Sequence, residues 1–163
     1  MPREHADIKM TPEELREFLR SDKRLVVATL DADGGGWVDA AAFTFFEDRV
    51  YFRLPTDTRS FRNIQRDARV CCVVESKPAA SSYYDIKGAM VHGVAEPTAV
   101  QTVPPAVREA LAAIPDPVAP DAPRDRQIFS IGLEDHTSFV FAKIKYRYED
   151  RALKNIQAEA GLV

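Results

Sequence analysis

The chain has 163 residues, of which 45% are hydrophobic and 29% are charged, and its net charge is −3. This length closes one hydrophobic core but hardly two, so we expect a single domain over residues 1–163. Because Lys and Arg nearly balance Asp and Glu, the composition argues against nucleic acid or an anionic membrane as a partner.

The start of the chain is charged and shows no signal peptide, which predicts a cytoplasmic protein. No run in the chain approaches the ~20 apolar residues of a membrane-spanning helix. The first predicted element is a helix, because Thr11 is a hydroxyl N-cap, Pro12 suits the first helical position and Glu14 can close a capping box. The apolar stripe of this helix consists of Leu15, Phe18 and Leu19.

Three strands are predicted to follow as an antiparallel meander over residues 24–30, 37–46 and 50–54, which are rich in β-branched and aromatic side chains. The first connection, 31–36, ends in three glycines, which tolerate the positive φ of a hairpin turn. The second is the tight turn 47–48. A glycine triplet can also cradle a phosphate, but that geometry needs a helix directly after the loop, and here a strand follows.

The rest of the chain is predicted to add a short helix, further strands and a proline-rich loop. Gly88 and Gly93 are expected at bends or bulges. Together, the expected elements predict a mainly β protein. Its fold is expected to be a closed or partly closed antiparallel barrel of six or seven strands with three short helices, rather than a doubly wound sheet. The expected segments are a helical turn at 59–66, strands at 70–75 and 83–96, a helix opened by Pro104 and Pro105, a proline-rich loop at 115–126, a last strand at 139–148 and a tail at 150–163, with the core over about 11–149.

The sequence offers no self-contained catalytic machinery. It lacks the motifs of serine hydrolases, P-loop proteins, dinucleotide-binding folds and zinc enzymes. Cys71 and Cys72 are adjacent in a strand pattern, where neighbouring side chains point to opposite faces, so we interpret them as core residues rather than a disulfide or metal ligands. We therefore predict no metal site and no catalytic side chain, and an enzyme of this sequence would depend on a cofactor.

A group of polar side chains lies where the third strand ends and the short helix begins. Unpaired backbone N–H groups at a helix start, the helix dipole, hydroxyl donors and arginines together suit a phosphate. A capped helix with solvated arginines is an equally good interpretation of these residues alone. The group consists of Arg53, Thr56, Thr58, Arg59, Ser60 and Arg62.

Five short segments occur in an order that resembles a known family. They are Val50-Tyr51-Phe52-Arg53, Thr58-Arg59-Ser60, Asn63-Ile64, Asp67-Ala68-Arg69-Val70 and Gly93-Val94-Ala95-Glu96. In the pyridoxamine 5'-phosphate oxidase-like flavoproteins, a strand of the form "lYF", a Ser/Thr-Arg-Lys turn, a helix ending in "NL", a "dPRV" strand start and a "G-x-A-E" strand follow one another. The resemblance covers roughly residues 11–98.

The resemblance implies a split β-barrel of Greek-key-like order, and a homodimer with cofactor sites at the subunit interface. The cofactor is usually FMN, and in some branches a deazaflavin (coenzyme F-420) or haem. Carried over by position, Thr58, Arg59 and Ser60 would face the phosphate, and Arg53 and Thr56 would flank it. The segment Ala41, Ala42, Phe43 and Thr44 would lie along the isoalloxazine ring.

The chain departs from the family in two places. Ser60 stands where FMN-binding members commonly have lysine, so Arg62 or Arg53 would have to substitute; a lost charged hydrogen bond costs about 1.5–3 kcal/mol. The C-terminal segment with Arg and His that true pyridoxamine phosphate oxidases use for substrate is missing, so vitamin B6 oxidation is not expected. The basic stripe of Lys143, Lys145 and Arg147 could meet an anionic deazaflavin tail or simply keep a strand face soluble.

The leading hypothesis is therefore a cytoplasmic, homodimeric oxidoreductase that passes hydride between a flavin or deazaflavin and a small organic substrate. No nucleic acid or membrane partner is expected. The alternative is a barrel without enzymatic activity that binds or stores haem, flavin or a lipid.

Overall fold

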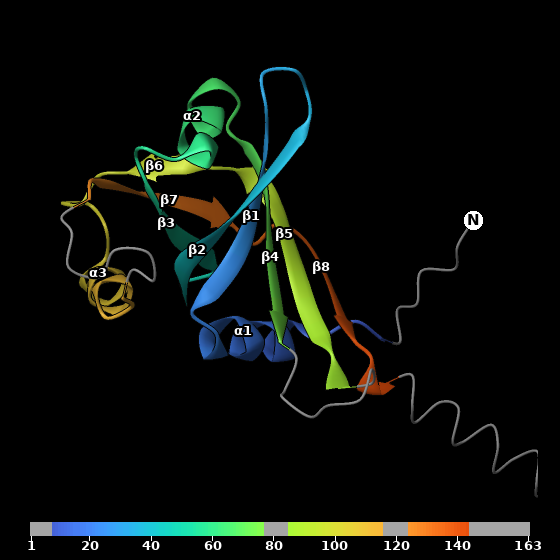
Figure 1. Cartoon of the computed structure of the whole chain (residues 1–163). Coiled ribbons are helices and arrows are strands. Elements are labelled where there is room, and N and C mark those ends of the chain that lie inside the picture. The colour runs from blue at the N-terminus through green and yellow to red at the C-terminus, as the bar shows by residue number, and fades with distance from the viewer. Residues whose placement is uncertain (1–7, 77–84, 116–123, 144–163) are drawn as a thin grey trace, which may run out of the picture.

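Eight strands form one curled antiparallel sheet in the computed structural model, which describes residues 8–76, 85–115 and 124–143 (Figure 1). The strand order across the sheet is β6-β7-β3-β2-β1-β4-β5-β8. The expected mainly β, antiparallel architecture is confirmed, although the described residues contain more strands than the six or seven expected. The strands are β1 (Arg24–Leu30), β2 (Gly36–Phe46), β3 (Arg49–Pro55), β4 (Arg69–Ser76), β5 (Lys87–Val94), β6 (Glu96–Thr98), β7 (Arg126–Gly132) and β8 (Asp135–Val140).

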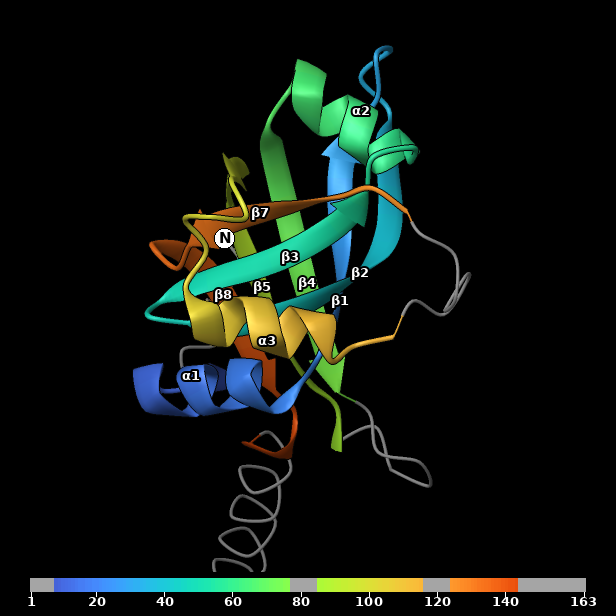
Figure 2. The same ribbon diagram turned by 90° about the vertical axis from the view of Figure 1, so that its left-hand side faces the viewer.

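Three helices accompany the sheet in the described residues: α1 (Pro12–Ser21), α2 (Arg59–Arg66) and α3 (Pro105–Ala112). The predicted capping box of α1 is present, since Thr11 Oγ1 accepts from the Glu14 N–H and the Glu14 carboxylate accepts from the Thr11 N–H. Figure 1 shows α1 at one end of the curled sheet and α2 at the other. Figure 2 shows α3 against the outside of β2 and β3. None of the helices in the described ranges is long and apolar enough to cross a membrane.

The core fills the inside of the curl. Strand residues that point inward, such as Phe43 and Phe52, are fully buried together with Leu15 and Leu19 of α1. The curl brings β5 close to β7 at the far side of the sheet. A smaller apolar cluster lies outside the curl, where α3 covers the sheet; it contains Tyr51, Val103, Val107 and Leu111.

The strand expected over 83–96 is in fact two strands with different neighbours. β5 pairs with β4 and β8 as far as residue 94, whereas β6 pairs with β7. The chain changes partner at Ala95, whose N–H donates to the Ala68 carbonyl at 2.7 Å. Because apolar residues continue through the point where the chain changes partner, the sequence does not reveal the change. Residues 83 and 84 lie outside the described residues.

The end of the chain also differs from the expectation of a last strand over 139–148. The strand β8 begins at Asp135 and ends at Val140, residues 141–143 leave the sheet, and 144–148 lie outside the described residues. β8 is an edge strand with polar side chains at its start, so its sequence lacks the apolar alternation that marks a buried strand. β7 likewise begins at the last position of the expected loop 115–126.

Candidate cofactor-binding site

A pocket of about 280 Å³ lies where the interior of β2 and the end of β3 meet the start of α2. Its wall is made of Asp39 to Ala42 of β2, Arg53 to Pro55 of β3, Thr58 at the start of α2, and Pro115, Arg124 and Arg126, which flank the proline-rich loop in sequence. Four of the predicted site residues therefore meet at one place, namely Ala41, Ala42, Arg53 and Thr58.

The register of the strands decides which side chains share the outer face of the sheet. Ala42 lies opposite Arg53, and Pro55 lies opposite Arg126, so these side chains are on one face. Ala40 joins them because side chains two residues apart on a strand point the same way. Ala41 points inward and is only 5% exposed, so it borders the pocket from the core side.

The basic side of the pocket consists of three half-buried arginines, Arg53, Arg124 and Arg126. Nη2 of Arg53 donates to the carbonyl of Ile114, which follows α3. Nη2 of Arg124 donates to Oδ1 of Asp57 at 2.6 Å, and its side chain is 24% exposed. These contacts fix the direction of two cationic groups beside the start of α2.

Thr58 caps α2, as the alternative interpretation of the polar group proposed. Its Oγ1 accepts from the Phe61 N–H at 3.3 Å and donates to the Pro55 carbonyl at 2.8 Å. The hydroxyl proton is thus bound within the protein, and the side chain presents only oxygen lone pairs to the pocket.

Ser60 lies away from the pocket, inside the end of the curl. Its side chain has no exposed surface, and Oγ donates to Oδ2 of Asp39 at 2.6 Å. The same carboxylate oxygen accepts from Nε1 of Trp37 at 3.0 Å. Ser60, which was expected to face a phosphate, is therefore part of an internal hydrogen-bond network.

Arg59 and Arg62 lie at a separate hollow of about 580 Å³ beside the β1–β2 turn. Arg59 binds the Asp31 carboxylate with two nitrogens and stacks its guanidinium over the Trp37 ring, 4.2 Å from the ring centroid. The hydrogen bond from Arg59 is the main reason that the pKa of Asp31 is lowered, and the bond from Asn63 adds to it. Arg62 donates to the Asp57 carbonyl at 3.1 Å.

The two remaining predicted residues do not line the pocket either. Thr44 lies opposite Tyr51, whose side chain packs in the cluster under α3. The N–H of Thr56 donates to the Asp125 carbonyl at 3.0 Å. Sequence reasoning missed Asp39, Arg124 and Arg126; two arginines directly after a proline-rich stretch were the signal available for the last two.

The middle of the outer face of β2, β1, β4 and β5 is apolar where a solvated sheet would be polar, and charged or polar side chains lie around it, namely Arg24, Glu75 and His92. Ala40 lies opposite Val26, Val26 lies opposite Val73, and Val73 lies opposite Met90, so one apolar row crosses four strands. Val26 is 41% exposed, and Val38 in the neighbouring row is 60% exposed. The half-buried Cys71 is on this face as well, whereas Cys72 is in the core. The row reaches the pocket at Ala40.

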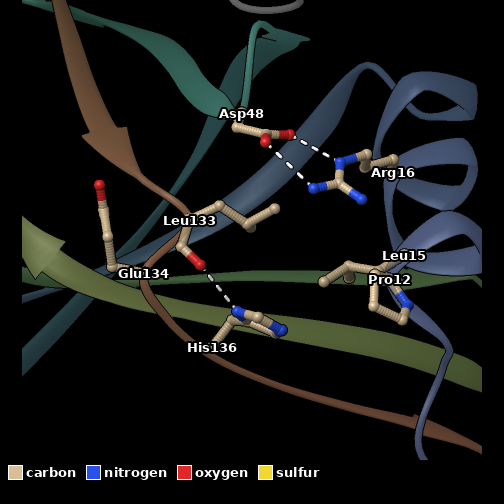
Figure 3. A pocket seen from close by; sticks show the side chains of 7 residues that line it. All are labelled: Pro12, Leu15, Arg16, Asp48, Leu133, Glu134 and His136. Carbon is tan, nitrogen blue, oxygen red and sulfur yellow. Dashed lines mark hydrogen bonds and ion pairs between the residues drawn. The ribbon is translucent and has the colours of Figure 1, made fainter.

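A second pocket of about 280 Å³ lies between α1 and the β7–β8 turn (Figure 3). Three of its polar groups are engaged with one another or with the backbone. Arg16 binds the Asp48 carboxylate with two nitrogens, and Nδ1 of His136 lies 2.8 Å from the Leu133 carbonyl. It contains none of the predicted site residues, so the pocket beside Ala40 is the better candidate.

A curled antiparallel sheet closed by short helices, with a ligand-sized pocket on its outer face, defines a protein of the split β-barrel class. Residues 11–137 match the sequence model of the pyridoxamine 5'-phosphate oxidase family. The chain belongs to this family, which confirms the resemblance seen in its motifs.

Comparison with solved structures also supports this fold. The chain is similar to a conserved hypothetical protein of Mycobacterium tuberculosis, with a TM-score of 0.65 and 20% identity over 86% of this chain and 91% of that one. It is also similar to a FAD-binding protein of Mesorhizobium loti, with a TM-score of 0.63 and 15% identity over 80% and 93%. A FAD and heme binding protein of Mycobacterium smegmatis matches with a TM-score of 0.58 and 17% identity over 80% and 71%. No curated protein matches the chain significantly.

Proposed function

We propose that the protein binds a phosphorylated flavin or deazaflavin in the pocket beside Ala40 and Ala42, and that it acts as a homodimeric oxidoreductase on a small organic substrate. The observation that supports this proposal is that one side of the pocket is lined by small residues and the other side by arginines. Ala40 and Ala42 leave room for a planar ring, and Arg53, Arg124 and Arg126 suit an anionic tail. FMN is the first candidate and coenzyme F-420 the second.

Haem is less suited to this pocket. Haem iron needs an axial ligand such as His, Cys, Met or Tyr. The described residues that line the pocket include none of these types. The lining therefore favours a flavin-type ring, which is held by packing and hydrogen bonds.

The apolar outer face supports the homodimer. A second copy of the chain laid against the row through Ala40, Val26 and Val73 would bury apolar surface that is exposed in a single chain. It would also cover the ring at the edge of the pocket, because the row reaches the pocket at Ala40. The dimer would therefore exclude water from the reacting face of the cofactor.

The bound flavin or deazaflavin would supply the hydride chemistry. The residues of this chain would bind its tail through arginines, leave space for its ring at the alanines, and shield it at the subunit contact. No side chain is assigned a proton-transfer role.

The test is titration of the purified protein with FMN, coenzyme F-420 and haem, followed by absorbance and fluorescence. Binding of FMN or the deazaflavin, together with reduction of the bound ring by a nicotinamide or deazaflavin donor and a dimer in sedimentation, would support the proposal. Binding without any reduction would favour a storage or carrier protein. A protein that binds neither flavin nor deazaflavin would refute the proposal.

A further inference from the structure

We propose that the pocket between α1 and the β7–β8 turn is a second binding site, which takes a small neutral phenol whose hydroxyl donates a hydrogen bond to Nε2 of His136. This pocket shares no lining residue with the pocket beside Ala40. The second site therefore does not depend on the binding of a flavin.

The walls of this pocket are held together by contacts within the protein. Two nitrogens of Arg16 bind the Asp48 carboxylate, which ties α1 to the β2–β3 turn. The Leu133 N–H donates to the Asp48 carbonyl at 3.1 Å, which ties the β7–β8 turn to the same turn. Because protein groups make these contacts among themselves, a ligand does not have to order the walls when it binds.

His136 presents a hydrogen-bond acceptor to the pocket. Its Nδ1 lies 2.8 Å from the Leu133 carbonyl oxygen. A carbonyl oxygen only accepts, so in the neutral ring Nδ1 carries the proton and Nε2 keeps its lone pair. Figure 3 shows the second ring nitrogen on the side of Pro12 and Leu15, away from this carbonyl. Within residues 8–76, 85–115 and 124–143, Nε2 has no hydrogen-bond partner.

The charged groups around the pocket favour a neutral occupant. Arg16 and Asp48 neutralise each other. The Glu134 carboxylate lies over Gly132, at the place that a Cβ would occupy, and Figure 3 shows it pointing away from His136. A ligand with a net charge would therefore have to break the Arg16–Asp48 pair or turn away from His136 to find a partner.

The rest of the lining suits one flat ring. Pro12, Leu15 and Leu133 supply apolar surface, and Figure 3 shows the Arg16–Asp48 pair on the other side of the pocket from His136. A guanidinium plane stacks well on an aromatic face. The volume of about 280 Å³ is just below the range of roughly 300–1,000 Å³ that drug-sized ligands occupy, so a single ring with one polar group has the right size.

The experiment titrates the full chain with phenol and with anisole, which has the same ring but a methyl group in place of the hydroxyl proton. It is run at about pH 8, where an ordinary imidazole is neutral. Calorimetry gives the affinities, and NMR of the histidine ring nitrogens reports on Nε2 directly.

The test variant is His136→Phe, which keeps a ring and removes the acceptor. His92→Phe is the matched control, because His92 is an exposed residue of β5 that follows Val91, the residue opposite His136, and so points to the other face of the sheet. Circular dichroism confirms that each variant is folded.

We expect the wild-type protein to bind phenol roughly three- to tenfold more tightly than anisole, which is the effect of one neutral hydrogen bond. The Nε2 resonance of His136 should shift with phenol and not with anisole. His136→Phe should bind the two compounds with similar affinity, and His92→Phe should keep the preference for phenol.

The proposal is overturned if the wild-type protein binds no phenol, if it binds phenol and anisole equally well, or if phenol leaves the Nε2 resonance of His136 unchanged. If His136→Phe does not fold, the wild-type spectra and affinities decide. No flavin is added in these titrations, so their failure is distinct from a failure of the proposed cofactor site.

Discussion

The Ser60 hydroxyl donates a hydrogen bond of 2.6 Å to Oδ2 of Asp39, and this contact ties the first turn of α2 to β2. Asp39 also accepts from the indole of Trp37. The carboxylate is therefore held by two donors, one from each of the two elements that meet at this end of the curl. Ser60 therefore has a structural role in this chain, at the position where the resemblance to the family led us to expect a phosphate contact.

Ser60→Ala should destabilise the protein by about 1–3 kcal/mol, because it removes a buried hydrogen bond to a charged group and leaves Asp39 with fewer donors. FMN affinity should stay close to the wild-type value. Chemical denaturation measures the first effect and fluorescence titration the second. Ser21→Ala, at the exposed last residue of α1, is the control with little expected effect, because the Ser21 hydroxyl donates to the Phe18 carbonyl of the same helix and not to a charged group. A large loss of FMN affinity at unchanged stability would place Ser60 in the phosphate site after all.

Asp31→Asn should make the stability of the protein less sensitive to acid. The hydrogen bonds from Arg59 and Asn63 lower the pKa of Asp31 in the folded chain. A carboxyl with a lowered folded pKa stabilises the protein above its unfolded pKa, near 3.8, and loses this contribution as the pH falls through the folded pKa. The wild-type protein should therefore lose stability below about pH 4, and Asp31→Asn should lose less over the same interval.

Urea midpoints measured from neutral pH down to about pH 2 test this expectation. Glu109→Gln, at an exposed position of α3, should keep the wild-type profile. Identical acid profiles for Asp31→Asn and the wild-type protein would show that the Asp31–Arg59 pair does not contribute to stability.

Local signals in the sequence were sufficient for much of the fold. The capping box at Thr11 and Glu14 defined the start of α1 because capping depends only on neighbouring residues. The tight turn at Glu47 and Asp48 also formed as predicted, with positive φ at both residues. The change of partner at Ala95 was missed, because the choice of neighbouring strand depends on residues distant in sequence.

The candidate site was only partly predictable for the same reason. Ala42, Arg53 and Thr58 are close in the meander, so their convergence followed from the order of the elements. Arg124 and Arg126 reach the pocket through the pairing of β7 with β3, which the sequence did not reveal. The burial of Ser60 depends on how α2 packs on the end of the curl, and a motif comparison carries no information on that packing.

Gly88→Ala should destabilise the protein, although Gly88 lies within a regular strand and not at the expected bulge. Gly88 faces Phe139 across the β5–β8 pair, and an added Cβ would lie 2.6 Å from Cζ of that ring and 3.0 Å from the Val74 carbonyl oxygen. The ring or the backbone must move, so we expect a loss of about 1–3 kcal/mol in chemical denaturation.

Gly93→Ala is the matched control in the same strand. Its added Cβ would meet Cβ of Ile131 at 3.6 Å, which is an ordinary contact, so its stability should remain within about 1 kcal/mol of the wild-type value. Equal losses of stability for both variants would show that the loss comes from the reduced backbone flexibility on replacing glycine in β5, and not from the limited space beside Phe139.

Val38→Glu should convert the proposed homodimer to monomer and weaken FMN binding. Val38 is 60% exposed in the single chain and lies opposite Ala28 on the apolar outer face, so the variant should fold normally. A carboxylate buried in the subunit contact should raise the dimer dissociation constant by roughly a hundredfold or more. Val100→Glu is the control, because Val100 is 51% exposed in the turn between β6 and α3, away from this face. Sedimentation of both variants and of the wild-type protein gives the oligomeric state, and a wild-type protein that sediments as a monomer with FMN bound would contradict the role of the outer face.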